Sequence, residues 1–301
     1  MDINLTSENL PIIKALANET RINILSLLKE RPLNGTQISH LLDLSPSIIN
    51  RHLKQLEEAK VIRLQYIEGT ERKQKYYIIA IDELRITFPI RIYEKYQKKI
   101  IDISVGSFSN FKAKPTCGLA SDEGYIGVLD EPKYFMVPER INAQLLWLSS
   151  GFIEYNFFNP VTSSSKVHLI EISFEIASEF PGSNYVWPSD IDFLFNNVNI
   201  GTWTSPGNYA DVRGHYTPSW WPDSNSQYGQ LKTIRITPEE TQIDGEKISN
   251  FKLSNINFDL TFFTLRFSNT EKNLNNGGIT LFGEKFGNYS QNIRVTVYYN
   301  D

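Results

Sequence analysis

Residues 36–56 contain two short helical patterns separated by a tight break, and no other stretch limits the fold of this sequence as strongly. The second pattern has a well-marked start, because Ser45 can cap a helix and Pro46 suits a first helical position. Apolar residues then repeat at helical spacing and predict one buried stripe, formed by Ile49, Leu53 and Leu56. The sequence therefore predicts two helices joined by a turn, the second packed along one edge.

The opposite face of this second helix carries small polar and cationic side chains. They are Ser47, Asn50, Arg51 and Lys54. Such a helix fits the major groove of DNA, where arginine favours guanine and asparagine favours adenine. A phosphate contact that carries no sequence information is the equally weighted alternative for Arg51 and Asn50. We also assign Thr36 and Ser45 to this DNA-facing surface, whereas His52 flanks the apolar stripe and should pack.

A hairpin is predicted after the two helices. Residues 61–67 and 76–81 are rich in branched or aromatic side chains and predict paired strands. The turn between them carries Arg72, Lys73 and Lys75, which are placed to meet phosphates or a minor groove. Upstream, residues 10–16 and 22–28 predict two more amphipathic helices, the second capped by Asn18. This order of elements describes a winged helix-turn-helix.

Two motifs resemble the arsenic-repressor (ArsR) family. Residues 14–25, Lys-Ala-Leu-Ala-Asn-Glu-Thr-Arg-Ile-Asn-Ile-Leu, are similar to the opening of that family, and residues 44–56 are similar to its recognition helix. The resemblance covers residues 8–80. It implies a homodimeric transcription regulator that binds double-stranded DNA at an inverted repeat, with recognition helices about 34 Å apart.

The sequence departs from the metal-sensing members of that family. They carry a Cys-x-Cys pair where this chain has Asn34 and Thr36, and Cys117 is its single cysteine. Because thiolate sensing needs two or three soft ligands, we expect no such metal sensing here. His40, His168 and His215 also lack the spacing of metal ligands. We expect no cofactor and no metal site.

Composition divides the chain near residue 100. Residues 1–100 hold 16 Lys and Arg against 12 Asp and Glu, whereas residues 101–301 hold 14 against 22. The acidic part also contains all five tryptophans and 15 of the 17 glycines. We therefore predict a DNA-binding domain over 1–81, a partly helical connection over 82–100 and a second domain over 101–301. Phosphate repulsion should keep the acidic domain off DNA.

From the sequence we expect neither a membrane-spanning segment nor a signal peptide. No apolar run approaches the roughly 20 residues that span a bilayer, and the first residues lack a basic start followed by an apolar core. A single cysteine also excludes an intramolecular disulfide. We therefore expect a cytoplasmic protein with no membrane partner.

Residues 101–301 are predicted to form β-sheet. Apolar and polar residues alternate over 166–177, 258–262 and 293–299, as in antiparallel strands with one buried face. Turn-rich stretches such as 205–208 and 275–278 separate the strands. We predict an all-β sandwich, jelly-roll-like, which makes the whole chain a two-domain α+β protein. One helix over 138–148 is expected to interrupt the strands.

The same region resembles a β-rich extension found on a bacterial subgroup of ArsR-like regulators. The matching blocks are residues 115–120, 144–148 with 151–155, and 282–289. This resemblance implies the architecture of the domain and leaves its ligand open.

Residues 201–229 hold the densest group of functional side chains in a loop-like segment. The candidate ligand-binding residues are Trp203, Asp211, Arg213, His215, Tyr216, Trp220 and Trp221. Aromatic rings stack on the C–H faces of sugars while polar groups bind the hydroxyls, so a carbohydrate is one candidate ligand. The alternative is that these aromatic residues fill a core beneath a long loop.

We expect a transcription regulator whose β domain senses a small molecule. The resemblance implies repression, which is the commonest output of the family, with activation as the alternative. One alternative is a β domain that mediates protein interaction or dimerisation without a ligand. A carbohydrate-active enzyme with two carboxylates is less favoured, because no pair can be assigned and no catalytic motif is present, so we assign no catalytic residue. A polar-lined concave site around Trp203, Trp220 and Trp221 would favour a ligand, and a flat apolar patch would favour a partner.

Overall fold

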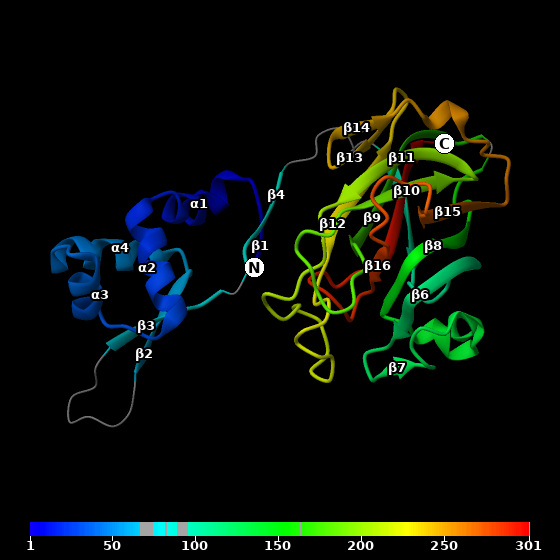
Figure 1. Cartoon of the computed structure of the whole chain (residues 1–301). Coiled ribbons are helices and arrows are strands. Elements are labelled where there is room, and N and C mark those ends of the chain that lie inside the picture. The colour runs from blue at the N-terminus through cyan, green and yellow to red at the C-terminus, as the bar shows by residue number, and fades with distance from the viewer. Residues whose placement is uncertain (67–74, 82, 89–95, 163, 301) are drawn as a thin grey trace. The chain divides into compact units, whose positions relative to one another are not determined.

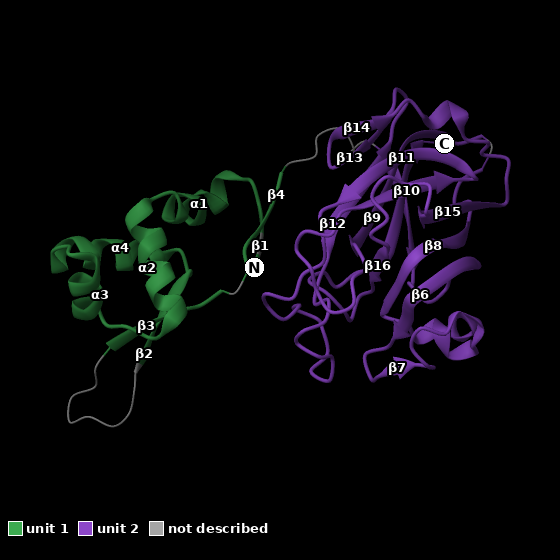
Figure 2. Cartoon of the chain, viewed as in Figure 1, with its two compact units in different colours: residues 1–94 green, residues 95–301 purple. Residues whose placement is uncertain are grey.

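The computed structural model describes residues 1–66, 75–81, 83–88, 96–162 and 164–300. The chain divides into two compact units, residues 1–94 and residues 95–301, which Figure 2 distinguishes by colour. The division falls within the predicted connection over 82–100. Each unit has its own hydrophobic core and is described here by itself.

The first unit is a winged helix-turn-helix, as the sequence predicts (Figure 1). Its helices are α1 (Leu10–Leu16), α2 (Glu19–Glu30), α3 (Gly35–Leu42) and α4 (Pro46–Glu58), preceded by a 3-10 turn at Ser7–Asn9. Its strands are β1 (Asp2–Asn4), β2 (Ile62–Tyr66), β3 (Lys75–Ile79) and β4 (Arg85–Thr87). The wing strands β2 and β3 pair antiparallel, and β1 pairs in parallel with β4.

Local capping explains where the helices begin. The Asn18 side chain accepts a hydrogen bond from the backbone N–H of Arg21 at 3.2 Å, so it caps α2 as predicted. Asn34 caps α3 and forms a reciprocal capping box with Gln37, with both hydrogen bonds at 2.9 Å. Ser45 occupies the capping position of α4, but its side chain bonds the Ser47 hydroxyl instead of the helix backbone. Asn34 is thus a helix cap at a position where thiolate sensors have a ligand.

Arg21 ties three helices of the first unit together from a buried position. Its guanidinium donates to the backbone oxygens of Lys14 at 2.7 Å and Ala15 at 2.5 Å, near the end of α1. It also donates to the Gln55 side chain of α4 at 2.5 Å and lies 3.4 Å from the His52 ring. Desolvation by burial lowers the pKa of His52, and the charges of Arg21 and Arg51 lower it further. His52 therefore packs inside the unit, as predicted.

The second unit is built almost entirely from strands. They are β5 (Gln97–Ile103), β6 (Asn110–Ala120), β7 (Tyr125–Ile126), β8 (Leu145–Phe158), β9 (Lys166–Ala177), β10 (Ser189–Phe195), β11 (Val198–Ser205), β12 (Gln230–Ile236), β13 (Thr241–Ile243), β14 (Glu246–Ser249), β15 (Phe262–Asn269), β16 (Ile279–Phe282) and β17 (Ile293–Asn300). Short 3-10 turns lie at Pro132–Met136, Pro138–Asn142 and Leu253–Asn255.

Strand pairing gives two layers that share one short strand. One layer has the order β11-β10-β15-β8-β6, and the other has the order β5-β17-β9-β12-β13-β14. Strand β16 pairs with the first half of β8 and with the end of β9, and so joins the layers. Every pairing in this unit is antiparallel, and many neighbours are distant in sequence. The second unit is therefore the predicted jelly-roll-like sandwich.

Three predictions about local structure are wrong. The expected helix over 138–148 is a single 3-10 turn followed by β8, because residues 145–148 are apolar on both faces of a strand. The expected strand over 258–262 begins only at Phe262. In the described part of the partly helical connection, residues 85–87 and 97–100 are strand, because each segment finds a pairing partner in β1 or β17.

Candidate functional site

The exposed face of α4 presents the polar and cationic residues that the sequence assigned to DNA. The apolar stripe of Ile49, Leu53 and Leu56 is fully buried, so the opposite face points to solvent. The exposed residues of the predicted set in the helix-turn-helix are Thr36, Ser45, Ser47, Asn50, Arg51 and Lys54. Lys54 also lies 3.8 Å from Glu58 in an exposed ion pair, which contributes little to stability.

The wing is described only in part. Lys75 is exposed at the start of β3. Arg72 and Lys73 lie outside the described residues, so their predicted phosphate contacts stay predictions. The predicted DNA-facing residues that the structure describes therefore come from α3, α4, the turn between them and one end of the wing.

The second candidate site lies on the outer face of the sandwich, where β6, β8 and β16 are neighbours. Gly118, Trp147 and Thr280 are paired across these three strands. Leu146 and Leu148 belong to the main core, so Trp147 points out of it. A Cβ atom on Gly118 would lie 2.3 Å from the Trp147 ring. Glycine at this position therefore lets the indole lie flat against β6.

Aromatic side chains from a distant loop cover Trp147. The Trp221 ring lies 5.8 Å from the Trp147 ring and 5.2 Å from the Phe286 ring, each at a steep angle. Tyr125 and Trp220 pack against Trp221 at centroid distances of 5.4 and 5.5 Å. The Trp221 indole N–H donates to the backbone oxygen of Ser226 at 3.0 Å and so holds the loop closed. These contacts form a second hydrophobic cluster outside the sandwich core.

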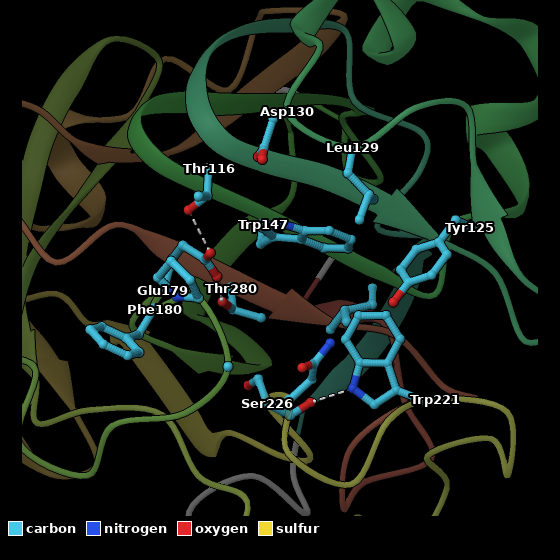
Figure 3. A pocket seen from close by; sticks show the side chains of 14 residues that line it. Thr116, Tyr125, Leu129, Asp130, Trp147, Glu179, Phe180, Trp221, Ser226 and Thr280 are labelled. Carbon is cyan, nitrogen blue, oxygen red and sulfur yellow. Dashed lines mark hydrogen bonds between the residues drawn. The ribbon is translucent and has the colours of Figure 1, made fainter.

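A cavity of about 160 Å³ lies beside this aromatic cluster (Figure 3). Its apolar wall includes Tyr125, Leu129, Leu145, Trp147 and Trp221. Its polar groups include Thr116, Asp130, Glu179, Asn225, Ser226 and Thr280. A mostly apolar concave surface with a few converging polar groups is the usual form of a small-molecule site.

Glu179 is the buried charge of this cavity. Its carboxylate accepts a hydrogen bond from the Thr116 hydroxyl at 2.8 Å. The Thr280 hydroxyl lies 3.3 Å from the other carboxylate oxygen and 2.9 Å from the backbone oxygen of Ser178, so Glu179 shares this donor. Desolvation by burial raises the pKa of Glu179 to about 7, and the charge of Asp130 raises it further, against the lowering effect of these hydrogen bonds. Asp130 accepts a hydrogen bond from the backbone N–H of Cys117 at 2.9 Å. The cavity therefore contains two carboxyl groups, one buried and one exposed.

Cys117 follows Thr116 on β6, and its thiol is buried in the main core. Burial raises the pKa of Cys117 to about 12, with further contributions from Asp130 and Glu179. The thiol is therefore protonated at neutral pH and unreactive.

Of the seven predicted ligand-binding residues, Trp221 lines this cavity and Trp220 packs behind it. Trp203 lies on β11 rather than in a loop, under the Lys232 ammonium group, which is 4.7 Å from its ring. Arg213 is exposed but holds the loop together through the backbone oxygens of Pro218 and Trp221. Asp211, His215 and Tyr216 are exposed on the loop, and Asp211 accepts a hydrogen bond from Tyr228. The structure thus does not bring the seven residues into one site.

Sequence reasoning missed most of the cavity. Trp147 lies within one of the blocks that carry the resemblance, 144–148, and is not among the predicted ligand-binding residues. Glu179 and Thr280 are not among them either. The available signal was the continuous apolar run at residues 145–148, which indicates a strand buried on both faces. Such a run at the outer face implies that something covers Trp147, but it does not identify the covering loop.

The described residues contain neither a membrane-spanning helix nor a cluster of metal ligands. No helix in the described ranges is both long and apolar enough to cross a membrane. No group of three or more His, Cys, Asp or Glu side chains in those ranges could hold a metal ion. Asp122, an acidic residue near the cavity, pairs with Lys285 at 2.7 Å.

Comparisons with solved structures give low overall similarity. HlyU from Vibrio cholerae is 27% identical over 25% of this chain and 79% of its own, with a TM-score of 0.22. The CBM36-1 domain of a multidomain xylanase from the hindgut metagenome of Trinervitermes trinervoides is 10% identical, covers 67% of this chain and 96% of its own, and has a TM-score of 0.27. Similarities at this level carry no inference about ligands.

Sequence comparisons are informative for the helical unit. Residues 18–63, which span α2, α3 and α4, match the family model described as bacterial regulatory protein, arsR family. An uncharacterized HTH-type transcriptional regulator of Methanocaldococcus jannaschii is 33% identical over 64 residues, which cover 21% of this chain and 67% of that protein. With the fold and the exposed recognition helix, these matches show that the chain belongs to the arsR family of bacterial regulatory proteins.

Proposed function

We propose that this chain is a homodimeric regulator that binds an inverted repeat in double-stranded DNA through α4, and whose β domain senses a small molecule. Family membership carries the DNA-binding part of this proposal. Repression is the output that the resemblance implies, in the cytoplasm where the operator DNA would be. The proposal gives the β domain a binding role and no catalytic one.

The exposed face of α4 supports the mode of DNA binding. Asn50 and Arg51 are exposed on the face opposite the buried stripe, so both can reach the edges of bases in a major groove. Two such helices related by a twofold axis would be about 34 Å apart on half-sites one turn apart. Arg51 is the residue most able to read guanine, because its guanidinium can bind two acceptors at once.

The cavity beside Trp147 and Trp221 supports the sensing role. It is concave and lined by both aromatic and polar groups, which is the arrangement that favours a ligand over a flat protein partner. A carbohydrate stays a candidate on the aromatic content of the wall. The cavity lies in the unit of residues 95–301, and the proposed DNA binding uses residues of the other unit. DNA binding therefore assigns no role to the cavity.

The DNA-binding proposal is tested by selecting sequences from a random duplex library with the purified full-length protein. The expected motif is an inverted repeat whose half-sites are about 10 base pairs apart. Arg51→Ala should then lose about 1–3 kcal/mol of binding free energy and relax specificity at one base position. Lys29→Ala, which removes an exposed cation of α2, is the matched control and should keep the specificity.

Two results would change this proposal. A uniform loss of affinity for all sequences in Arg51→Ala would reduce that residue to a phosphate contact. Recovery of a single half-site, together with a monomer mass in solution, would contradict the dimer.

A further inference from the structure

We infer that the cavity between Trp147, Trp221 and Glu179 binds a small organic cation, an ammonium group carried on an apolar ring or chain. This inference rests on the proposed sensing role of the β domain and names the chemical class of its ligand. It is argued from the charge, the aromatic wall and the unpaired polar group of the cavity.

The cavity is lined by acidic residues, and no basic residue of the lining balances their charge. Asp130 and Glu179 are its ionisable acids, and none of its 14 lining residues is Lys, Arg or His. Glu179 is 7% exposed, and its neutral partners Thr116 and Thr280 donate hydrogen bonds without supplying positive charge. A buried carboxylate is costly unless it is paired, so a cationic ligand would stabilise its charged form.

The aromatic wall fits the same ligand. The Trp147 and Trp221 rings meet at 68°, and Tyr125 lies 5.4 Å from Trp221 at 55°, so three rings form adjoining walls. Aromatic faces attract cations through their electron density, and tryptophan does so most strongly. Aromatic walls beside a carboxylate are the arrangement that recognises ammonium groups, whereas a neutral sugar needs no net negative charge.

Ser226 adds a polar group to the cavity wall that no other described residue satisfies. Ser226 lines the cavity and is 6% exposed as a residue, and its buried hydroxyl oxygen has no hydrogen-bond partner among the described residues, as is also true of three buried polar atoms away from the cavity. Buried hydroxyls are nearly always paired, so a ligand group that reached this one would supply the partner that the chain does not. The hydroxyl can accept a hydrogen bond from an ammonium group or pair with a hydroxyl on the same ligand.

The size of the cavity limits the ligand. A volume of about 160 Å³ is close to that of a protein cavity of about 150 Å³ that holds a benzene ring. A six-membered ring or a short branched chain therefore fits, with any larger part extending through the open side. Cyclohexylamine, choline and benzylamine are probes of about this size that carry one positive charge at pH 8.

The test is isothermal titration calorimetry of the full-length protein at pH 8 with three matched pairs of compounds. Each cation is compared with a neutral molecule of similar shape: cyclohexylamine with cyclohexanol, choline with 3,3-dimethyl-1-butanol, and benzylamine with benzyl alcohol. At least one cation should bind at least tenfold more tightly than its neutral partner. The buffer must contain no amine, because an amine buffer would compete for the site.

Two variants remove charge from the cavity with little change of shape. Glu179→Gln should abolish the preference for the cation. Asp130→Asn should reduce it and is the safer variant, because Asp130 has a positive φ of 62° that asparagine tolerates, and the amide oxygen can still accept from Cys117. Glu239→Gln, at an exposed position in the turn after β12, removes the same charge outside the cavity and should keep the preference.

The outcomes distinguish failure of the cation assignment from failure of the proposed sensing function. Equal binding of a cation and its neutral partner, lost in Trp221→Ala, would overturn the cation assignment and leave a sensing site for neutral ligands. Binding by none of the three cations would also overturn it. Tight binding of a cation that leaves DNA affinity unchanged would confirm the site and contradict the sensing function.

Discussion

Replacing Glu179 with glutamine should make the stability of the β domain less dependent on pH. Burial raises the pKa of this carboxyl from 4.5 to about 7, so the folded state holds its proton more tightly than the unfolded chain does. Its contribution to stability is therefore fully present below pH 4.5 and is lost as the pH rises through about 7. Glutamine does not titrate, so the variant should gain stability relative to the wild type as the pH rises.

The size of the effect follows from the gap between the two pKa values. At about 1.4 kcal/mol for each pH unit, the gap between 4.5 and about 7 corresponds to about 3 kcal/mol. The difference in unfolding free energy between wild type and variant should change by roughly this amount between about pH 4 and pH 8. Burial also raises the pKa of Glu175 to about 7. Glu175 is present in both proteins, so its contribution to the pH dependence cancels in the comparison.

Urea denaturation followed by tryptophan fluorescence measures this difference directly. All five tryptophans lie between residues 147 and 221, so the signal reports the β domain even in the full-length chain. Glu239→Gln is the control for removal of an exposed carboxyl and should show the pH dependence of the wild type. A constant difference between wild type and Glu179→Gln across this pH range would refute a raised pKa for Glu179.

Three further substitutions test the packing. Arg21→Met should destabilise the helical unit by about 2–4 kcal/mol, since it leaves two backbone oxygens of α1 and the Gln55 side chain without their donor, as loss of helical circular dichroism would show. Gly118→Ala should destabilise the β domain by about 1–3 kcal/mol and shift tryptophan fluorescence, because its methyl group would overlap the Trp147 ring. Ser226→Ala should leave the ligand-free protein equally or up to about 1 kcal/mol more stable; a clear loss would mean that the hydroxyl has a partner.

The helix-turn-helix could be predicted because its signals are local. Pro46 fixes the start of α4, and the stripe of Ile49, Leu53 and Leu56 follows from the helical period, so neither needs information from distant residues. The strands β9 and β17 were also predicted correctly from alternation. The expected helix over 138–148 failed because an apolar run of this length fits a buried helix as well as a strand buried on both faces.

The cavity could not be predicted because its residues meet only through strand pairing and loop packing. Gly118, Trp147 and Thr280 come together through the registers of β6, β8 and β16, which no short stretch of sequence encodes. The density of aromatic residues at 201–229 drew attention to Trp221, which lines the cavity, but also to Trp203, which lies on β11 and packs against Lys232 of β12. Proximity in sequence grouped residues that the sandwich separates.

Thermodynamic linkage gives a test of sensing that does not depend on how the two units are arranged. A ligand in the cavity can change DNA affinity only if its own affinity differs between the free and DNA-bound protein, and the factor must be the same in both directions. Typical coupling of about 1–3 kcal/mol corresponds to about 5–150-fold. If a cation weakens binding of the selected DNA tenfold, saturating DNA must weaken binding of the cation tenfold.

The reciprocal measurement also identifies where an effector acts. Trp221→Ala removes one wall of the cavity and should abolish both changes together. DNA binding without ligand should stay intact, because Trp221 lies outside the unit that contains α4 and the other predicted DNA-binding residues. A cation that weakens DNA binding equally in wild type and Trp221→Ala acts by competing for phosphates, as any cation can. That result, which calorimetry with and without DNA would reveal, would contradict sensing through the cavity even if the cavity binds cations.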